Sequence, residues 1–257
     1  MSGPSSIRIG VSGALGRMGQ VLTGLVQSGE GLELTARVDR ADADAGLVTP
    51  EAAVAACDVL IDFSTAGAAA ALARLAAGRG SPALVIGATG FSPADEAAVA
   101  EAAQRIAIVK SGNFSLGVNL LLGLVAQAAR ALPAQDYDIE VFEAHHRRKA
   151  DAPSGTALML GEAAARGRGV ELGAVSERAR DGLPGPRAAG AIGFSVMRGG
   201  GIVGEHEVVF AAEDEIIRLA HSARDRSLFA RGALQAARWV AGRPAGLYGM
   251  SDVLGLG

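Results

Sequence analysis

The chain alternates short apolar runs with longer segments of helical periodicity. In the first half, residues 7–11, 32–38, 59–63, 83–86 and 106–109 are apolar runs of strand length. Val21, Leu22, Leu25 and Val26 recur at helical spacing after the first run, and residues 66–77 form an alanine-rich helix pattern. Strands that alternate with helices predict a parallel sheet covered by helices.

The pattern changes after about residue 116. A long helix pattern leads to a strand predicted at 137–142, and strands predicted at 191–198, 202–211 and 215–222 follow one another with only turns between. Consecutive strands indicate an antiparallel or mixed sheet. We therefore predict an α/β fold, with a Rossmann-like, mostly parallel, doubly wound sheet and a second α+β domain. The predicted domains are 1–116 with 226–257 for dinucleotide binding, and 117–225 for substrate binding and oligomerisation.

Composition narrows the function. The 257 residues are 49% hydrophobic and carry a formal net charge of −3. The basic residues do not form a cluster of the kind that binds nucleic acid. The longest apolar stretch, 118–126, is too short for a bilayer span of about 20 residues. The start shows no export signal, and Cys57 is the single cysteine, which fits a reducing compartment. We expect a cytoplasmic protein that acts on a metabolite, without membrane or nucleic-acid partners.

A glycine-rich turn joins the first strand to the first helix. Gly13, Gly16 and Gly19 follow the strand at 7–11, in the order strand, turn and helix that holds a pyrophosphate. The spacing differs from the usual Gly-x-Gly-x-x-Gly, so an ordinary βα turn is the alternative. Asp39 ends the second strand about 20 residues later, where an acidic side chain accepts hydrogen bonds from an adenosine ribose. Arg40 favours a 2′-phosphate, so we expect both NADH and NADPH to be used.

Further loops are expected at the carboxyl ends of the same sheet, where ligands of such folds bind. Phe63, Ser64 and the segments 87–89 and 111–114 follow predicted strands. Each segment alone is best interpreted as an ordinary loop, but together the segments favour a cofactor cleft.

The segment 143–156 is typical of a site that binds an anion and donates a proton. His145, His146 and Lys149 lie between a strand pattern and a helix start at which Ser154 is the expected N-cap. Histidines titrate near neutrality, and helix-start N–H groups and cations bind carboxylates. The alternative is a solvated basic loop. The two adjacent histidines lack a second pair at ligand spacing, so no metal site is assigned.

Two other features of the second half each allow two interpretations. The segment 198–201, Arg-Gly-Gly-Gly, could cradle a phosphate, but a hairpin turn between two strands is the favoured interpretation. Glu205 and His206 alternate along a strand, so one of them is expected to point inward.

These motifs carry a family resemblance. Residues 143–157, Glu-Ala-His-His-Arg-Arg-Lys-Ala-Asp-Ala-Pro-Ser-Gly-Thr-Ala, closely resemble the signature of the 4-hydroxy-tetrahydrodipicolinate (dihydrodipicolinate) reductases of lysine biosynthesis. Supporting matches are 16–19, 61–64, 87–91, 113–119 and 202–206, so the resemblance spans nearly the whole chain. Arg148 is a departure, because many relatives carry another histidine there.

The resemblance implies an NADPH- or NADH-dependent reductase of the diaminopimelate pathway, with a small dicarboxylate cyclic imine as substrate and a homotetramer as the assembly. It implies His145 as a proton donor or acceptor, Lys149 as a proton donor, and His146, Gly155 and Thr156 as substrate contacts. The dinucleotide contacts that it implies are Gly13, Ala14, Leu15, Gly16, Arg17, Met18, Asp39, Arg40, Gly87, Ala88, Thr89, Ser111, Gly112, Asn113 and Phe114.

Two other functions fit the sequence less well. One is a Rossmann oxidoreductase that reduces a different imine or amino acid, and the other is a non-catalytic nucleotide sensor. The grouping of Lys149, Gly155 and Thr156 favours a small polycarboxylate over other substrates. A sensor has no need for titratable residues beside a hydride path.

Overall fold

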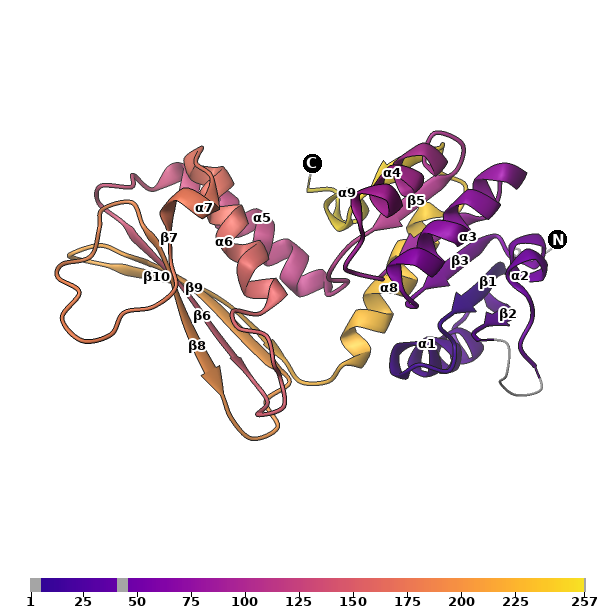
Figure 1. The fold of residues 1–257 in the computed structure, drawn as a ribbon, viewed down its shortest axis with the longest axis horizontal. Coiled ribbons are helices and arrows are strands. Elements are labelled where there is room, and N and C mark those ends of the chain that lie inside the picture. The colour runs from indigo at the N-terminus through magenta and orange to yellow at the C-terminus, as the bar shows by residue number, and fades with distance from the viewer. Residues whose placement is uncertain (1–5, 41–45, 257) are drawn as a thin grey trace. The chain divides into compact units, whose positions relative to one another are not determined.

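The computed structural model describes residues 6–40 and 46–256, which fall into two compact units. Unit 1 consists of Met1–Leu116 and Ser227–Gly257, and unit 2 is Gly117–Arg226. Unit 2 is thus an insertion in the sequence of unit 1, and Figure 1 shows the fold of each. Among the described residues, no helix has the length and apolar character that crossing a membrane requires.

Unit 1 contains a parallel sheet of six strands in the order β11-β5-β4-β3-β1-β2. The strand β1 lies between β2 and β3, which both follow it in the chain. The direction in which strands are added to the sheet therefore reverses at β1. The predicted Rossmann-like sheet is confirmed. Its strands are β1 (Ile7–Ser12), β2 (Leu32–Val38), β3 (Val59–Asp62), β4 (Ala83–Ile86), β5 (Ala107–Lys110) and β11 (Gly246–Tyr248).

Helices cover both faces of this sheet because its strands bury side chains on both sides. On one face, Ile9, Val11 and Ile61 pack against α1 (Arg17–Ser28) and α8 (Ser227–Val240). On the other face, Leu60 and Ile86 pack against α2 (Pro50–Ala56), α3 (Ala66–Arg79) and α4 (Pro93–Ala102). The short α9 (Met250–Leu254) follows β11 and adds Met250 and Val253 to the first of these cores.

Unit 2 contains a mixed sheet of five strands in the order β10-β9-β6-β8-β7. β6 pairs in parallel with β8 and antiparallel with β9, as the prediction of a mixed sheet allows. The strands are β6 (Asp138–His145), β7 (Ser176–Glu177), β8 (Ile192–Arg198), β9 (Gly204–Ala211) and β10 (Ile216–Ala223), and the helices are α5 (Leu116–Ala131), α6 (Gly155–Arg168) and α7 (Leu172–Val175).

The hairpin expected around residues 198–201 is wrong. β6 lies between β8 and β9, so the connection from Arg198 to Gly204 crosses the end of β6 instead of joining paired neighbours. Gly199 N–H donates to the carbonyl of His145, and Arg147 N–H donates to the carbonyl of Gly200. The glycine-rich segment is therefore bound to the loop that follows β6.

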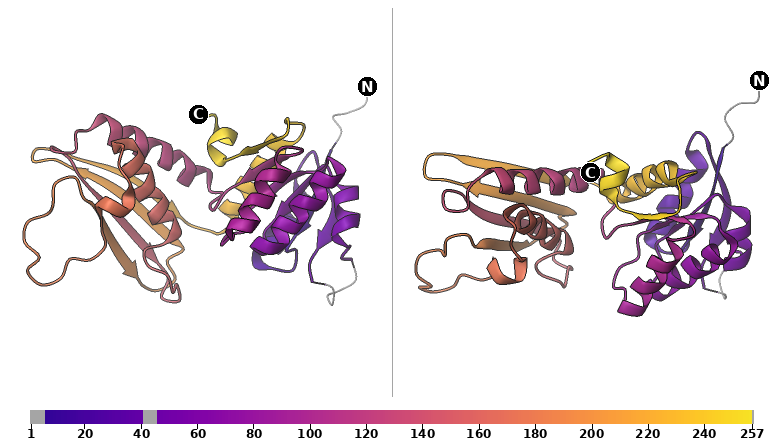
Figure 2. Two further views of the ribbon diagram at one scale, coloured as in Figure 1. Left: turned by 45° about the horizontal axis from the view of Figure 1, so that its top comes forward. Right: turned by 90° about the horizontal axis from the view of Figure 1, so that it is seen from above.

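The two faces of the unit 2 sheet differ. One face is covered by α5 and α6 (Figure 2). Ile139, Val141 and Phe210 lie on this face and form one core with the two helices. Residues that alternate with these along the strands, such as Phe142 and Val209, lie on the opposite face. Met197 and Ile216 also belong to that opposite face and are exposed.

Candidate functional site

The glycine turn lies at the point where the strand order of the unit 1 sheet reverses. Gly13 has φ +73°, and a Cβ there would lie 2.7 Å from the carbonyl oxygen of Phe63. A Cβ on Gly19 would lie 2.1 Å from the carbonyl oxygen of Gly13, so α1 packs directly on the turn. Both positions require glycine, and the turn brings bare backbone to the carboxyl end of β1, where Rossmann folds hold a pyrophosphate.

Asp39 fastens this turn to the end of β2. Its Oδ2 accepts a hydrogen bond from Leu15 N–H at 2.7 Å, and its Oδ1 accepts one from Arg40 N–H at 2.8 Å. A carboxylate oxygen has two acceptor sites, so each can still accept from a ribose hydroxyl. The acidic residue predicted as a ribose contact is thus also a brace of the phosphate-binding turn, which the sequence did not indicate.

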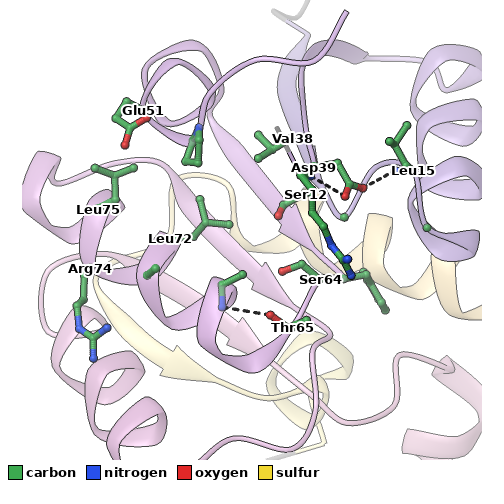
Figure 3. Close-up of a pocket in the computed structure, with 17 residues that line it drawn as sticks. Ser12, Leu15, Val38, Asp39, Glu51, Ser64, Thr65, Leu72, Arg74 and Leu75 are labelled. Carbon is green, nitrogen blue, oxygen red and sulfur yellow. Dashed lines mark hydrogen bonds between the residues drawn. The ribbon is translucent and has the colours of Figure 1, made fainter. Parts of the chain in front are cut away.

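A cavity of about 960 Å³ opens beside Asp39 (Figure 3). Gly13, Leu15, Gly16, Asp39 and Arg40 line it, so five residues of the predicted dinucleotide site meet there. The opposite wall comes from α2 and α3, and the sequence analysis missed it because these residues carry no motif. That wall includes Pro50, Glu51, Leu72, Arg74 and Leu75. A largely apolar cavity with a few polar groups at its rim suits a flat heteroaromatic base.

A second cavity, of about 480 Å³, lies at the carboxyl ends of β4 and β5. Ala88, Thr89, Ser111 and Gly112 line it, together with Lys110, Phe91 and Tyr248. Lys110 Nζ lies 4.1 Å from the centre of the Phe91 ring and 2.5 Å from Glu96 Oε1. Ala14, Arg17, Met18, Gly87, Asn113 and Phe114, although predicted as dinucleotide contacts, line neither of these two cavities.

Several of those six residues have structural partners in unit 1. Ala14 and Phe114 are buried in the core that α1 and α8 form with one face of the sheet. Asn113 Oδ1 accepts a hydrogen bond from Ser115 N–H at 2.8 Å, which shapes the loop after β5. Phe63 contacts Gly87 closely, because a Cβ on Gly87 would lie 2.4 Å from the Phe63 ring.

In unit 2, the signature segment connects the end of β6 to the start of α6. His145 is the last residue of β6, and Gly155 is the first residue of α6. The Ser154 side chain accepts a hydrogen bond from Ala157 N–H at 3.2 Å, which confirms the predicted N-cap. His145, His146, Lys149, Gly155 and Thr156 therefore lie on one loop and the helix turn that follows it.

A buried carboxylate lies behind this loop. Glu143 is 0% exposed and accepts hydrogen bonds from Arg198 Nη1 and Nη2, at 2.7 and 2.8 Å, and from Ser154 N–H at 2.9 Å. Its Oε2 also lies 2.6 Å from His145 Nδ1. Burial by itself raises the pKa of the Glu143 carboxyl, but the hydrogen bonds from Arg198, His145 and Ser154 outweigh burial and hold this pKa below its usual range.

Two histidines face each other beside Glu143. The rings of His145 and His206 meet edge to face with centroids 5.1 Å apart, and His206 Nε2 lies 3.1 Å from Ser154 Oγ. Burial, and secondarily the nearby His145, lower the pKa of His206 to about 4. His206 is therefore a neutral, inward-facing member of the site, as expected for one residue of the 205–206 pair.

The cations of the loop are held near the surface. Lys149 Nζ pairs with Asp151 Oδ1 at 2.8 Å, and His146 Nε2 lies 3.1 Å from Arg226 Nη2. Desolvation and the charges of Arg148 and Arg226 lower the pKa of His146. Arg148 itself is exposed. Within the described residues, no group of three or more His, Cys, Asp or Glu side chains is arranged to hold a metal ion.

The reversed strand order, the glycine turn and the cavity at Asp39 define a Rossmann-type NAD(P) domain of an oxidoreductase. Unit 2 carries a segment from the end of β6 to the start of α6 that holds two histidines and several cationic side chains. The comparisons with known proteins specify the family.

Residues 7–114 match the family described as "Dihydrodipicolinate reductase, N-terminus", and residues 117–254 match "Dihydrodipicolinate reductase, C-terminus". A 4-hydroxy-tetrahydrodipicolinate reductase of Caulobacter vibrioides is 60% identical over 250 residues, covering 97% of both chains. Another, of Rhizobium rhizogenes, is 52% identical and covers 98% of this chain and 97% of the relative.

A solved structure, the dipicolinate-bound dihydrodipicolinate reductase of Paenisporosarcina sp. TG-14, shares the fold. It has a TM-score of 0.80 and 24% identity, and the match covers 96% of this chain and 99% of that chain.

The chain belongs to the dihydrodipicolinate reductase family. It is an enzyme of lysine and diaminopimelate biosynthesis, and the predicted family and enzyme class are confirmed. Membership of this family implies a nicotinamide cofactor.

Proposed function

We propose that this 4-hydroxy-tetrahydrodipicolinate reductase binds NADPH or NADH in unit 1 and binds and protonates its cyclic dicarboxylate substrate in unit 2. The 4-hydroxyl group leaves as water together with a hydrogen of the neighbouring ring carbon, which forms a carbon–carbon double bond. The reduction then adds a hydride to one carbon of this double bond and a proton to the other. A reduced nicotinamide, when bound, supplies the hydride. The single observation that carries the proposal is the loop of residues 145–156, which combines a histidine hydrogen-bonded to a carboxylate, a lysine and a helix start.

The cavity and glycine turn of unit 1 fit a dinucleotide. Bare backbone at Gly13 and the N–H groups that start α1 suit a pyrophosphate, and Asp39 suits ribose hydroxyls. Arg40 is exposed at the rim of the same cavity, where its guanidinium can pair with a 2′-phosphate. We therefore propose that the residues predicted from the family resemblance contact the dinucleotide and that both cofactors are accepted.

Fluorescence titration with NADPH and NADH tests this proposal. A preference below about a thousandfold, roughly 4 kcal/mol, is expected for the unmodified enzyme. Arg40→Ala should weaken NADPH about tenfold and leave NADH nearly unchanged, because only NADPH carries the 2′-phosphate. Arg105→Ala, at an exposed position that does not line the cavity, is the control. Equal loss of both cofactors in Arg40→Ala contradicts this role for Arg40.

The start of α6 suits a carboxylate of the substrate. Gly155 and Thr156 are in the first turn of α6, where the helix dipole favours an anion. A Cβ at Gly155 would meet nothing within 4 Å, so the approach to this backbone is open. We propose that Gly155 and Thr156 bind one carboxylate and that His146 and the cations of the loop bind the rest of the dianion.

His145 and Lys149 are the proposed proton donors. General acids of this kind contribute about 10² to 10⁴-fold to turnover. His145→Gln and Lys149→Ala should each lower kcat by about that factor while dinucleotide affinity stays unchanged. The assay follows the loss of NADPH absorbance, with the substrate produced in the cuvette by the preceding pathway enzyme. Normal turnover in both variants refutes the assignment.

A substrate panel separates this function from that of a related imine reductase. The proposal expects activity with the cyclic dicarboxylate and none with monocarboxylate imines or amino acids, since the loop presents several anion-binding groups. Activity with the latter compounds would favour the alternative oxidoreductase.

The open face of the unit 2 sheet supports the proposed homotetramer. Met197 and Ile216, at 49% and 57% exposed, leave apolar surface on this face, which is typical of an assembly surface. Sedimentation of the purified chain should give the tetramer mass, and Met197→Glu should lower it. A monomer at micromolar concentration would contradict this assembly. We further propose that the enzyme works in the cytoplasm.

A further inference from the structure

Glu143 is the most deeply buried charged residue of the signature segment. It lies on β6 two residues before His145, so both side chains project from the same face of the sheet. Its exposure is 0%, and that of His145 is 8%. Burying a carboxylate is unfavourable unless the charge is paired and hydrogen-bonded. The groups that are hydrogen-bonded to Glu143 therefore indicate its role.

The carboxylate joins three separate parts of the chain. Oε2 contacts His145 Nδ1 at 2.6 Å, Oε1 accepts from Ser154 N–H at 2.9 Å, and the Arg198 guanidinium meets both oxygens. Arg198 Nη2 also donates to the carbonyl oxygen of Asp151 at 2.7 Å. The start, middle and end of the loop are therefore all tied to one ion pair.

We propose that Glu143 is a positioning residue for the reduction. It fixes the ring orientation and the tautomer of His145. It also holds that ring at a fixed position relative to the start of α6, which binds the substrate carboxylate. The inference rests on the proposed function, because it assigns a role to Glu143 through His145. The two ideas make separable predictions.

The hydrogen-bond chemistry sets the tautomer. An ionised carboxylate can only accept, and the hydrogen bonds that surround Glu143 favour its ionised form, so Nδ1 of His145 must carry a proton. Nε2 is then the nitrogen that gains and gives the exchangeable proton. Gly204 leaves room beside it, because a Cβ there would lie 3.2 Å from Nε2.

Other charged groups act on the same pair. Arg198 reaches Glu143 from β8, His206 faces it from β9, and His221 pairs with His206 from β10. Lys149 and Asp151 lie on the loop itself. Since Arg198 offsets the carboxylate charge, Glu143 orients the ring without leaving an uncompensated charge in the interior.

Glu143→Gln is the primary test, because an amide keeps the shape and removes the charge. The amide can no longer accept from all of its present donors, so His145 loses its fixed tautomer. We expect kcat to fall about 10² to 10³-fold, with NADPH affinity within twofold of the unmodified enzyme. Glu162→Gln, exposed on α6, should change neither quantity.

A double-variant comparison tests whether Glu143 acts through His145. In a His145→Gln background, Glu143→Gln should lower kcat less than about threefold further. A full additional 10² to 10³-fold loss would mean that Glu143 acts independently of His145 and would overturn the inference.

Two measurements keep the inference testable if Glu143→Gln folds poorly. The pair Glu143→Gln/Arg198→Met removes both charges together, and it should show the same loss of kcat with a normal circular dichroism spectrum. Nitrogen NMR of the unmodified enzyme should show the Nδ1–H tautomer for neutral His145, assigned with His145→Gln among only four histidines. The Nε2–H tautomer would overturn the inference.

The outcomes distinguish the two proposals. If His145→Gln loses turnover and Glu143→Gln does not, the positioning role fails and the proposed function stands. If neither variant loses turnover, the assignment of His145 as a proton donor fails as well.

Discussion

Lowering the pH from 7 to 5 is expected to destabilise the protein through His206. The pKa of this residue is about 4 in the folded protein against an ordinary value of 6.5, because His206 is buried and lies beside His145. Between these two values the unfolded chain binds more protons than the folded protein, so the free energy of unfolding rises with pH in this window and is lost as pH falls. For a group with these two pKa values, the loss at pH 5 is about 2 kcal/mol.

Urea unfolding followed by circular dichroism at several pH values measures this effect. His206→Gln has its own constant cost, so the informative quantity is the pH dependence of its stability relative to the unmodified protein. That difference should shrink by about 2 kcal/mol between pH 7 and 5. Val208→Ala is the control, since Val208 is buried on the same strand and carries no titratable group, so its cost in stability should not depend on pH.

Parallel curves for His206→Gln and the unmodified protein would refute the reasoning. They would mean that His206 binds its proton equally well in the folded and unfolded chains.

Two further predictions concern the cap of α6 and the glycine turn. Ser154→Ala removes the cap bond to Ala157 and the partner of buried His206 Nε2, so it should cost about 2–4 kcal/mol in urea unfolding. Thr49→Ala, an exposed cap of α2, should cost only about 1 kcal/mol, and equal losses would argue against a role for His206. Gly19→Ala places a Cβ 2.1 Å from the Gly13 carbonyl, so unit 1 should lose about 1–3 kcal/mol and bind NADPH at least tenfold more weakly by fluorescence titration. Gly24→Ala, with nothing within 4 Å, should stabilise α1 by about 0.5–1 kcal/mol, and unchanged NADPH affinity in Gly19→Ala would contradict the packing argument.

Local sequence signals predicted the features that depend on neighbouring residues. The glycine turn, the strand at Leu32–Val38 and the Ser154 cap are each encoded within a few positions, by apolar runs, glycines or a capping side chain.

Features that depend on strand order could not be predicted from the sequence. Glu143 and His206 are paired across β6 and β9, yet 63 positions of sequence separate them, and no local pattern records that register. The same limit produced the wrong hairpin at 198–201, because a glycine-rich connection gives no indication that β6 lies between the strands it joins. The wall of α2 and α3 at the first cavity was missed because Leu72 and Leu75 are indistinguishable from ordinary core residues.

The insertion of unit 2 into unit 1 has a consequence for synthesis on the ribosome. α8 buries Ala230, Ala233 and Ala237 against the first core, and β11 pairs with the edge of β5, but both are translated after all of unit 2. A nascent chain of the first 116 residues therefore presents an open apolar face and an unpaired strand edge, features that promote aggregation. Unit 2 is continuous in sequence and can complete its fold first. Unit 1 can complete its fold only after the last residues of the chain have left the ribosomal exit tunnel.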